Sequence, residues 1–246
     1  MTSFWPQIRT VGVTGMLVSF ADALSEPSNR AALAFRARIE RESWDGVIET
    51  SSTLASAFIR FDPLVLSHAV LRTRLEGLLA QEDWFQAAPP EGRRFWRIPA
   101  VFGGDLAPQL NEAAQAAGMS AQDAIASLSG ARVRVITLGF AAGQPYLGEL
   151  PEAWNLPRQT ALTSQVPEGA LVVAIRQFVL FATTAPTGWR HVAQTAFRSF
   201  RPDDAEPFAL RAGDEVQFEP VTREAFEAIR ARDSSGNGGA VRERIA

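Results

Sequence analysis

Apolar runs in the first ninety residues predict a mixed α and β segment. Runs rich in β-branched residues predict strands at Val11–Phe20, where two glycines allow a hairpin, and at Val47–Thr50 and Ala55–Phe61. Apolar residues at helical spacing predict helices at Pro27–Arg41 and from Pro63 to about residue 79, each opened by a proline. The order β-α-β-β-α indicates a small α+β domain.

A polar linker, Ala87–Arg94, separates this segment from a chain of different texture. A strand is predicted at Phe95–Val101, followed by two short helices at Leu106–Ala117 and Ser120–Leu128, the second with a capping serine. Short strand candidates then alternate with Gly- and Pro-containing turns, at Val133–Phe140, Ala170–Ile175, Phe178–Phe181, Ala193–Phe200 and Glu215–Glu219. Such frequent short strands predict a closed β structure, a barrel or a sandwich.

Three segments are therefore expected. Residues 1–88 form an α+β domain whose element order resembles a ferredoxin-like domain. Residues 95–222 form the β-rich domain. Residues 223–246 hold a helix at Glu224–Arg232 and a tail, Asp233–Ala240, that its Gly- and Ser-rich composition predicts to be flexible.

Composition excludes several classes of function. The chain has 246 residues, 46% of them hydrophobic, and a net charge of −3, so it carries no electrostatic footprint for nucleic acid. No apolar stretch approaches a membrane span. The absence of cysteine excludes disulfides, thiolate metal sites and cysteine nucleophiles. Because Met1–Arg9 shows no secretory signal, we expect a cytoplasmic protein that binds neither nucleic acid nor membrane.

Standard catalytic and cofactor motifs are absent from the sequence. No P-loop, dinucleotide fingerprint or nucleophile elbow occurs, so no motif predicts a bound cofactor. The two histidines, His68 and His191, are too few for an all-histidine metal site, and no metal is expected. Each is most simply a packed histidine, and Asp62 before Pro63 is most simply a turn or cap residue.

The richest local feature is the stretch 139–151, GFAAGQPYLGELP. Its three glycines and two prolines interrupt a predicted strand. Glycine serves where φ is positive or where a ligand approaches the backbone, and a loop with exposed amides can bind an anion. A wide loop between barrel strands explains the same residues, so both interpretations stay open.

Motifs along nearly the whole chain resemble those of one protein family. Gly139–Pro151 resembles the hallmark GF-x-PGF-x-YLG-x-LP, Ile98–Gly104 resembles IPV-x-YGG, and Val166–Gly169 resembles VPxGSV. Gln177 falls on the glutamine of GGxQTGxYP. The other matches are Pro157-Arg158 for a PR pair, Pro186, Gly188 and Trp189 for SPGGW, and Leu210, Gly213-Asp214, Val216 and Phe218–Pro220 for L-x-x-GD-x-V-x-F-x-P. By their order and spacing the chain resembles the bacterial 5-oxoprolinase B subunits, also called KipI-type kinase-inhibitor proteins or allophanate hydrolase subunit 1.

This resemblance implies an α+β fold, with a small ferredoxin-like N-terminal domain followed by a cyclophilin-like β-barrel domain. It implies association with a C-subunit homologue, itself a cyclophilin-like barrel protein, and with an A subunit. The family's complex hydrolyses 5-oxoproline to glutamate at the cost of ATP, so ATP is implied for the complex by resemblance alone. One branch of the family inhibits a sporulation histidine kinase.

Several motif positions differ from the family pattern. The family's polar groups or glycines are replaced at Leu128 (histidine), Thr163 (arginine), Ile175 (glycine), Phe178 (threonine) and Thr187 (glycine), and the hallmark's proline and second phenylalanine are Ala142 and Gln144. Either the protein has a more apolar pocket with another ligand or a partner-only role, or the family's chemistry lies mainly on the partners. The sequence leaves both open.

Two main hypotheses of function follow. The first is a subunit of a hydrolase acting on cyclic amides, with Gln177 and His191 as catalytic candidates. Its substrate-binding candidates are Gly139, Gly143, Tyr146 and Arg158, because backbone amides and a guanidinium suit a carboxylate or phosphate.

The second hypothesis is a non-catalytic regulatory or binding protein of the kinase-inhibitor type. An exposed apolar patch around Phe178, Leu180 and Phe181 would support it. A stand-alone barrel that binds a small molecule is a third possibility.

Overall fold

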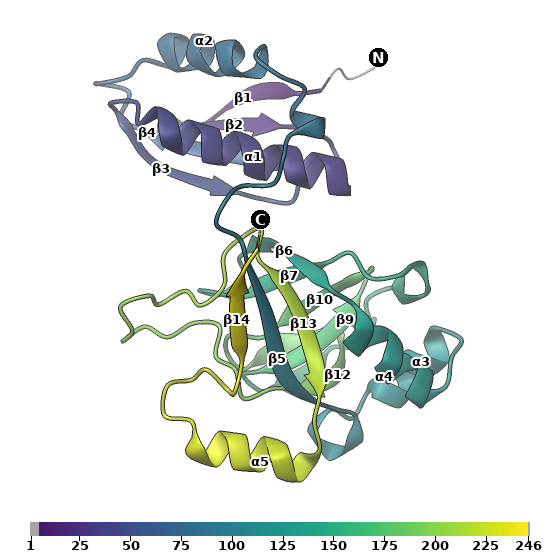
Figure 1. Cartoon of the computed structure of the whole chain (residues 1–246). Coiled ribbons are helices and arrows are strands. Elements are labelled where there is room, and N and C mark those ends of the chain that lie inside the picture. The colour runs from purple at the N-terminus through teal and green to yellow at the C-terminus, as the bar shows by residue number, and fades with distance from the viewer. Residues whose placement is uncertain (1–4, 246) are drawn as a thin grey trace. The chain divides into compact units, whose positions relative to one another are not determined.

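The computed structural model describes residues 5–245. Residues 1–4, which belong to the stretch Met1–Arg9 where no secretory signal is predicted, lie outside the described residues. The chain divides into two compact units, residues 1–91 and 92–246 (Figure 1).

Within its described residues, the first unit is a four-stranded antiparallel sheet that shares one core with two helices. The sheet order is β1-β2-β4-β3. The elements are β1 Gln7–Val11, β2 Gly15–Ser19, α1 Glu26–Glu42, β3 Val47–Ser52, β4 Ser56–Phe61, α2 His68–Leu79 and the 3-10 turn η1 Trp84–Gln86. The predicted strand Val11–Phe20 thus forms the turn and second strand of a hairpin. The name ferredoxin-like stays a prediction for this unit.

Helix α2 begins later than the sequence predicts. The Asp62 carboxylate accepts a hydrogen bond from the Leu64 amide at 2.9 Å, so this aspartate makes the expected turn. Leu64 lies before the helix and is 94% exposed. Ser67 caps the helix instead. In its first turn, His68 packs edge-on against Phe61 with ring centroids 4.8 Å apart, as the packed-histidine interpretation predicts.

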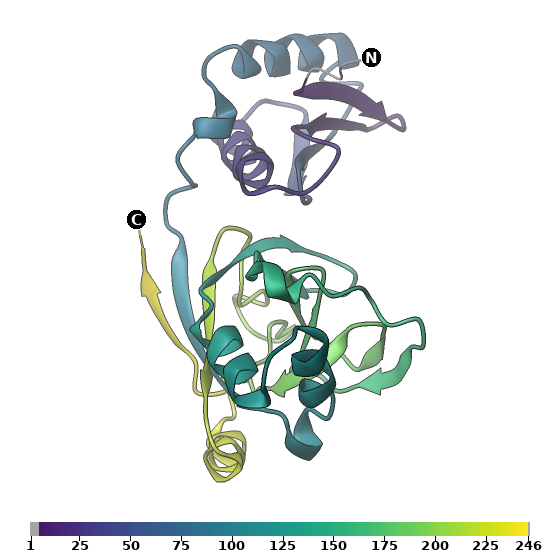
Figure 2. The same ribbon diagram turned by 90° about the vertical axis from the view of Figure 1, so that its right-hand side faces the viewer.

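The second unit is a barrel that closes, within the described residues, through seven strands in the order β12-β9-β10-β7-β6-β13-β5 and back to β12. Helices α3 and α4 lie over one open end (Figure 2). The elements are β5 Arg94–Phe102, η2 Gly104–Leu106, α3 Leu110–Ala116, α4 Ala121–Gly130, β6 Val133–Leu138, β7 Pro145–Gly148, η3 Glu152–Trp154, β8 Thr163–Val166, β9 Ala170–Ala174, β10 Gln177–Leu180, β11 Ala185–Thr187, β12 Arg190–Gln194, β13 Glu215–Pro220, α5 Arg223–Arg232 and β14 Val241–Arg244. The predicted mixed fold with a closed β structure is confirmed as an α+β barrel; the name cyclophilin-like stays a prediction.

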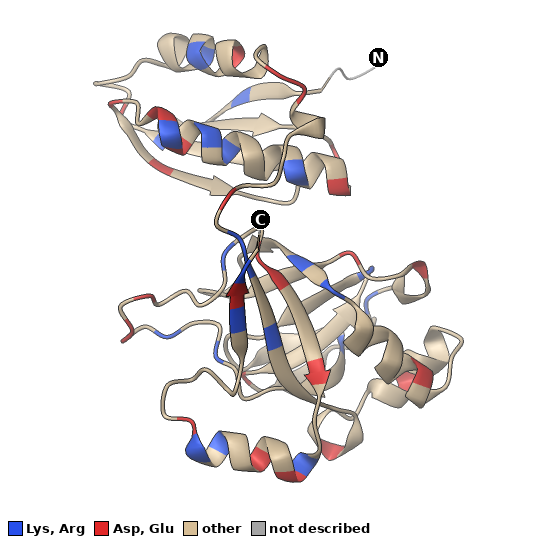
Figure 3. Ribbon diagram, viewed as in Figure 1, with Lys and Arg blue, Asp and Glu red and all other residues tan. Residues whose placement is uncertain are grey.

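Strand β5 closes the barrel and also binds the C-terminal segment. It runs parallel to β13 on one side. On the other side of β5, the first half of β5 pairs with β14. The end of β5 pairs with β12, where Ala193 lies opposite Phe102. The tail that composition predicts to be flexible therefore leads from α5 into a strand. Charged residues of both signs lie along α5, with basic residues at both ends and two glutamates between them (Figure 3).

Alternation along the strands gives the barrel wall two apolar faces. Phe178 and its interior neighbours form the barrel core, where Phe178 meets Phe218 edge-on at 5.7 Å. Val179, one residue later, belongs to a separate outer cluster with Val172 and Trp189. The ribbon formed by β8 and β11 contributes Val166 and Ala185 to this outer cluster. A second apolar layer thus lies outside the barrel, and the candidate site is built there.

A buried ion pair links the start of β5 to the turn before β13. Arg94 Nη2 donates to the Asp214 carboxylate at 2.5 Å, and both side chains are almost inaccessible. The same carboxylate accepts the amides of Arg94 and Arg211 and the Trp96 indole. Gly213 precedes it with φ of +94°, a conformation that suits glycine. The Gly-Asp motif near the end of the sequence is therefore structural.

Candidate functional site

A cavity of about 260 Å³ lies on the outer face of the barrel, and we call it the aromatic cavity. Its walls come from β7, β10, β11 and the segment after η3. It is lined by Phe140, Gln144, Tyr146, Arg158, Gln159, Leu162, Val179, Phe181, Pro186, Thr187, Gly188 and Trp189. Two of the predicted substrate-binding residues, Tyr146 and Arg158, meet here.

Trp189 organises the polar end of the aromatic cavity. The Tyr146 ring meets it edge-on with centroids 6.2 Å apart. The Arg158 guanidinium lies over the same indole, with Cζ 5.4 Å from the ring centre. Among residues 5–245, no carboxylate pairs with Arg158. An exposed guanidinium held by a ring and lacking an acidic partner is suited to bind an anionic group of a ligand.

The glycine-rich loop forms the rim of this cavity rather than its floor. Phe140 is 77% exposed and has φ of +72°, an uncommon conformation for a bulky residue. Gly139 and Gly143 do not line the cavity. The Gly139 amide donates to the Gln144 carbonyl at 3.0 Å, and a Cβ on Gly143 would lie 2.8 Å from that of Phe200. Packing within the chain therefore explains Gly143, and the substrate-binding role of both glycines stays a prediction.

Gln177 lies apart from the aromatic cavity. It is the first residue of β10, opposite Gly148 and Ala174, and is only 6% exposed. Strand alternation places it on the same outward face as Val179, which does line the cavity. Its catalytic role stays a prediction.

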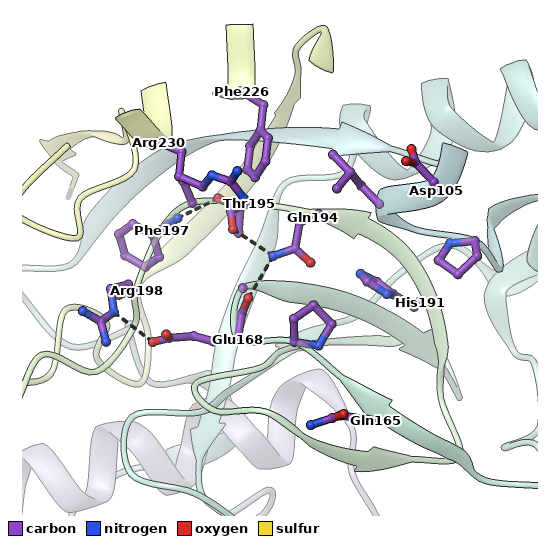
Figure 4. Close-up of a pocket in the computed structure, with 15 residues that line it drawn as sticks. Asp105, Gln165, Glu168, His191, Gln194, Thr195, Phe197, Arg198, Phe226 and Arg230 are labelled. Carbon is purple, nitrogen blue, oxygen red and sulfur yellow. Dashed lines mark hydrogen bonds and ion pairs between the residues drawn. The ribbon is translucent and has the colours of Figure 1, made fainter. Parts of the chain in front are cut away.

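His191 lines a second cavity of about 540 Å³, which we call the polar cavity (Figure 4). Its walls come from β12, the β8–β9 loop, the η2 turn and α5. Two buried side chains of β12 face it, His191 at 4% and Gln194 at 7% exposure. Burial lowers the pKa of His191 below its ordinary value, outweighing contacts with Ala193 and Gln194 that act in the opposite direction.

Gln109, at the start of α3, stands between the two cavities. Its carbonyl oxygen accepts the His191 amide at 2.8 Å. Its amide nitrogen donates to Gln159 at 3.2 Å and to Thr163 at 3.3 Å. Thr163, which replaces a family arginine, thus helps to hold the wall between the cavities.

Other changed motif positions have structural roles. Leu128 and Phe178 are fully buried in the barrel core, and the Thr187 hydroxyl accepts the Trp189 amide at 3.0 Å. Ile175 has φ of +43°, so the position where the family has glycine does adopt the conformation that glycine favours. The changes thus lie in the barrel interior, at one turn and in the aromatic cavity, which Gln144 and Thr187 line.

The apolar patch expected for a regulatory protein is not exposed. Phe178 and Leu180 are fully buried and Phe181 is 5% exposed. The first two face the barrel core and the third the outer cluster. The strand is covered on both faces, so these three residues give the regulatory hypothesis no support.

Sequence reasoning misses two residues of these cavities. The SPGGW motif marks Trp189 as a family position but assigns it no role in binding. In the structure Trp189 lies next to Tyr146 and forms a wall of the aromatic cavity. Nothing in the sequence singles out Gln194. A β-bulge places it beside His191, and no pattern in the sequence signals that bulge.

The structure adds no metal centre and no membrane helix to this picture. Across residues 5–245, no group of three or more His, Cys, Asp and Glu side chains is placed to hold a metal ion. In the same part of the chain, no helix has the length and apolar character to cross a membrane.

Comparisons with known proteins agree with the motifs. A family model described as carboxyltransferase domain, subdomain C and D, matches residues 6–210. The 5-oxoprolinase B subunit of Bacillus subtilis (strain 168) is 28% identical over 236 residues, covering 91% of this chain and 96% of that protein.

Two solved structures resemble the chain. The crystal structure of TTHA0988 superposes with a TM-score of 0.71 at 28% identity, over 88% of this chain and 40% of that one, so this chain spans less than half of that protein. The urea amidolyase of K. lactis matches 98% of this chain and 16% of its own with a TM-score of 0.74, and at 18% identity it shows the fold alone. The family expected from the motifs is thereby confirmed: the chain belongs to the carboxyltransferase-domain C and D family, that of the 5-oxoprolinase B subunits and allophanate hydrolase subunit 1.

Proposed function

We propose that the protein is a subunit of an ATP-dependent hydrolase complex of the 5-oxoprolinase type, which acts on a cyclic amide. The observation that carries this proposal is the match to a protein named as a 5-oxoprolinase B subunit over nearly the full length of both chains. The aromatic cavity supports it, because within the described residues it offers a cation without a carboxylate partner, beside two aromatic rings, in a space suited to a small ligand.

In this proposal the aromatic cavity holds 5-oxoproline or a close analogue. The Arg158 guanidinium binds the substrate carboxylate, a pairing that its planar fork favours. The Trp189 indole and the Tyr146 ring flank the five-membered ring. Hydrolysis adds water to the lactam carbonyl and breaks its C–N bond, which yields the amino and carboxylate groups of glutamate.

Partners complete the site in this proposal. A C-subunit homologue and an A subunit associate with this chain in the cytoplasm, and ATP binds to a partner because this chain has no phosphate-binding motif. Gln177 acts in catalysis from the same outer wall. The family likeness also supports naming the two units ferredoxin-like and cyclophilin-like.

Arg158 gives the sharpest test of the cavity assignment. In the reconstituted complex, Arg158→Gln is expected to raise KM for 5-oxoproline about 10- to 100-fold, since a hydrogen bond to a charged group contributes roughly 1.5–3 kcal/mol. Steady-state release of glutamate measures it.

The matched control is Arg74→Gln. Arg74 also lies over an indole, with Cζ 5.5 Å from the centre of the Trp44 ring, but in the first unit. An equal rise in KM for both variants, or none for Arg158→Gln, would remove Arg158 from the substrate site.

A further inference from the structure

The aromatic cavity contains a buried side-chain amide whose nitrogen has no partner in the chain. Gln144 lines this cavity and is 1% exposed. Its Oε1 accepts a hydrogen bond from the Ala182 amide at 3.4 Å, whereas its Nε2 donates to none of residues 5–245. This nitrogen is not one of the fully enclosed atoms without a partner, so the small surface that Gln144 keeps includes it. A ligand in the cavity can therefore reach this donor.

Strand geometry places the Gln144 side chain on the cavity wall. Gln144 immediately precedes β7, and its carbonyl accepts a hydrogen bond from the Gly139 amide at 3.0 Å, so it continues the strand. Residues two apart in a strand share a face, with Cα atoms about 7 Å from each other. Gln144 thus lies on the face of Tyr146, together with Val179, which pairs with Tyr146 from β10 and also lines the cavity.

The polar side chains of the cavity offer several donors and no carboxylate. The Thr187 hydroxyl accepts a hydrogen bond from the Trp189 amide at 3.0 Å, so its own hydrogen stays available to a ligand. Arg158 adds a guanidinium that, within the described residues, has no acidic partner. No Asp or Glu of the described residues lines the cavity. A matching ligand therefore carries acceptor oxygens, and a free ammonium group would find no counter-charge.

The surroundings of the Gln144 amide make its free donor informative. Val179 and Phe181, both buried apolar residues, line the same wall. Buried polar groups in native proteins are nearly always paired, because an unpaired one carries an unfavourable desolvation free energy. The hallmark motif has phenylalanine at this position, so the donor distinguishes this chain from the motif.

We propose that Gln144 is a specificity-determining residue, whose Nε2 donates a hydrogen bond to the ring carbonyl oxygen of a cyclic amide while Arg158 binds the carboxylate. The inference rests on the proposed function and narrows its substrates to rings that carry both a carboxylate and a ring carbonyl. Hydrolysis removes the ring carbonyl and creates an ammonium group, so glutamate is expected to bind more weakly than 5-oxoproline.

The test compares two ring acids that differ in one oxygen. 3-Oxocyclopentanecarboxylate keeps the carboxylate and the ring carbonyl of 5-oxoproline, and cyclopentanecarboxylate lacks the carbonyl. Calorimetric titration of the reconstituted complex without ATP gives both dissociation constants. The complex is expected to bind the oxo acid about 3- to 10-fold more tightly, the contribution of one hydrogen bond to an uncharged acceptor. Equal binding of the two acids would overturn the inference.

A variant assigns that preference to one side chain. Gln144→Met removes the donor and keeps an unbranched side chain. It is expected to abolish the preference for the oxo acid and to leave the dissociation constant of cyclopentanecarboxylate unchanged. The matched control is Gln194→Met, because Gln194 is also a buried glutamine of the barrel but faces the polar cavity. This control should retain the preference, and a preference that survives Gln144→Met would refute the role of Gln144. If Gln144→Met does not fold, the comparison of the two acids in the unmodified complex still decides.

Arg158→Gln separates this inference from the proposed function. It is expected to weaken the binding of both acids about 10- to 100-fold, since each carries the carboxylate. Weaker binding in this variant, together with a preference that survives Gln144→Met, would refute only the role of Gln144. Unchanged binding of both acids in Arg158→Gln would refute the assignment of the aromatic cavity as the substrate site, and the inference with it.

Discussion

At the turn between β9 and β10, two residues with large side chains occupy a conformation that usually belongs to glycine. Ile175 has φ of +43° and Arg176 of +60°, as in the two-residue hairpin turns that prefer Asn-Gly. Hydrogen bonds from the Ile175 amide to Leu156 and from the Arg176 amide to Trp154 hold the turn at 2.8 and 2.9 Å. The surrounding chain therefore maintains a strained backbone.

Replacing the β-branched residue should relieve that strain. Ile175→Gly is expected to raise the free energy of unfolding by about 1 kcal/mol, because positive φ in a residue with a side chain costs roughly 1–3 kcal/mol and glycine costs some unfolded-state entropy. Urea denaturation measures it. The control is Ile48→Gly, a similarly exposed isoleucine in β3 without positive φ, which should lower stability. Equal destabilisation by both changes would contradict the strain argument.

His191 should make stability depend on pH. Burial lowers its folded-state pKa below the ordinary 6.5. As the pH falls below 6.5, the unfolded state takes up a proton at this histidine that the native state does not hold. The contribution of His191 to stability is therefore fully present above pH 6.5 and is lost as the pH falls through the folded-state pKa. The charged groups around the cavity, Asp105, Glu168, Arg198 and Arg230, are paired with other residues.

The measurement is denaturant unfolding between about pH 8 and about pH 5. The unmodified chain should lose stability over this range, His191→Phe should lose less, and His68→Phe should follow the unmodified chain. The same pH dependence in His191→Phe would show that other groups cause it.

At the scale of elements, the strands that sequence predicts are those with a buried face. β5, β6, β9, β10 and β13 fall close to their predicted positions because their apolar runs are continuous or alternate. The sequence does not predict β7, β8, β11 or β14, and it places β12 three residues too late, at Ala193–Phe200 instead of Arg190–Gln194. β7 contains a proline and a glycine, β8 is mostly polar, and all four residues of β14 are exposed. Their pairing comes from the backbone and from neighbours distant in sequence, which no local pattern records.

The buried ion pair between β5 and the turn before β13 should matter more than exposed pairs of equal length. Asp214→Ala is expected to lower the free energy of unfolding by about 3–5 kcal/mol, since it leaves the Arg94 guanidinium buried without a counter-charge. Thermal and denaturant unfolding measure it. Asp105→Ala removes a 2.6 Å pair with Arg223 that is largely exposed and should change stability far less. Similar losses in both variants would show that burial does not decide the contribution of the pair.

At the scale of the molecule, family motifs predict more than hydrophobic pattern does. Pattern alone indicates a closed β structure but not which strands adjoin, so it cannot show that Tyr146 and Arg158 share a cavity while His191 lies in another. The motif residues predict the family correctly because many of them fix the fold: Gly169 and Gly213 have positive φ and Asp214 joins the two ends of the barrel sequence. The bulge in β12 shows the limit, because one additional residue reverses which side chains face outward.

A working role for this chain in the complex is tested most directly by ATP-dependent release of glutamate from 5-oxoproline, with the chain co-purified with its own A and C partners. We predict turnover that is lost when this chain is omitted and restored when it is added back. A stable complex without turnover, in an assay where a B subunit with complete motifs is active, would contradict the account.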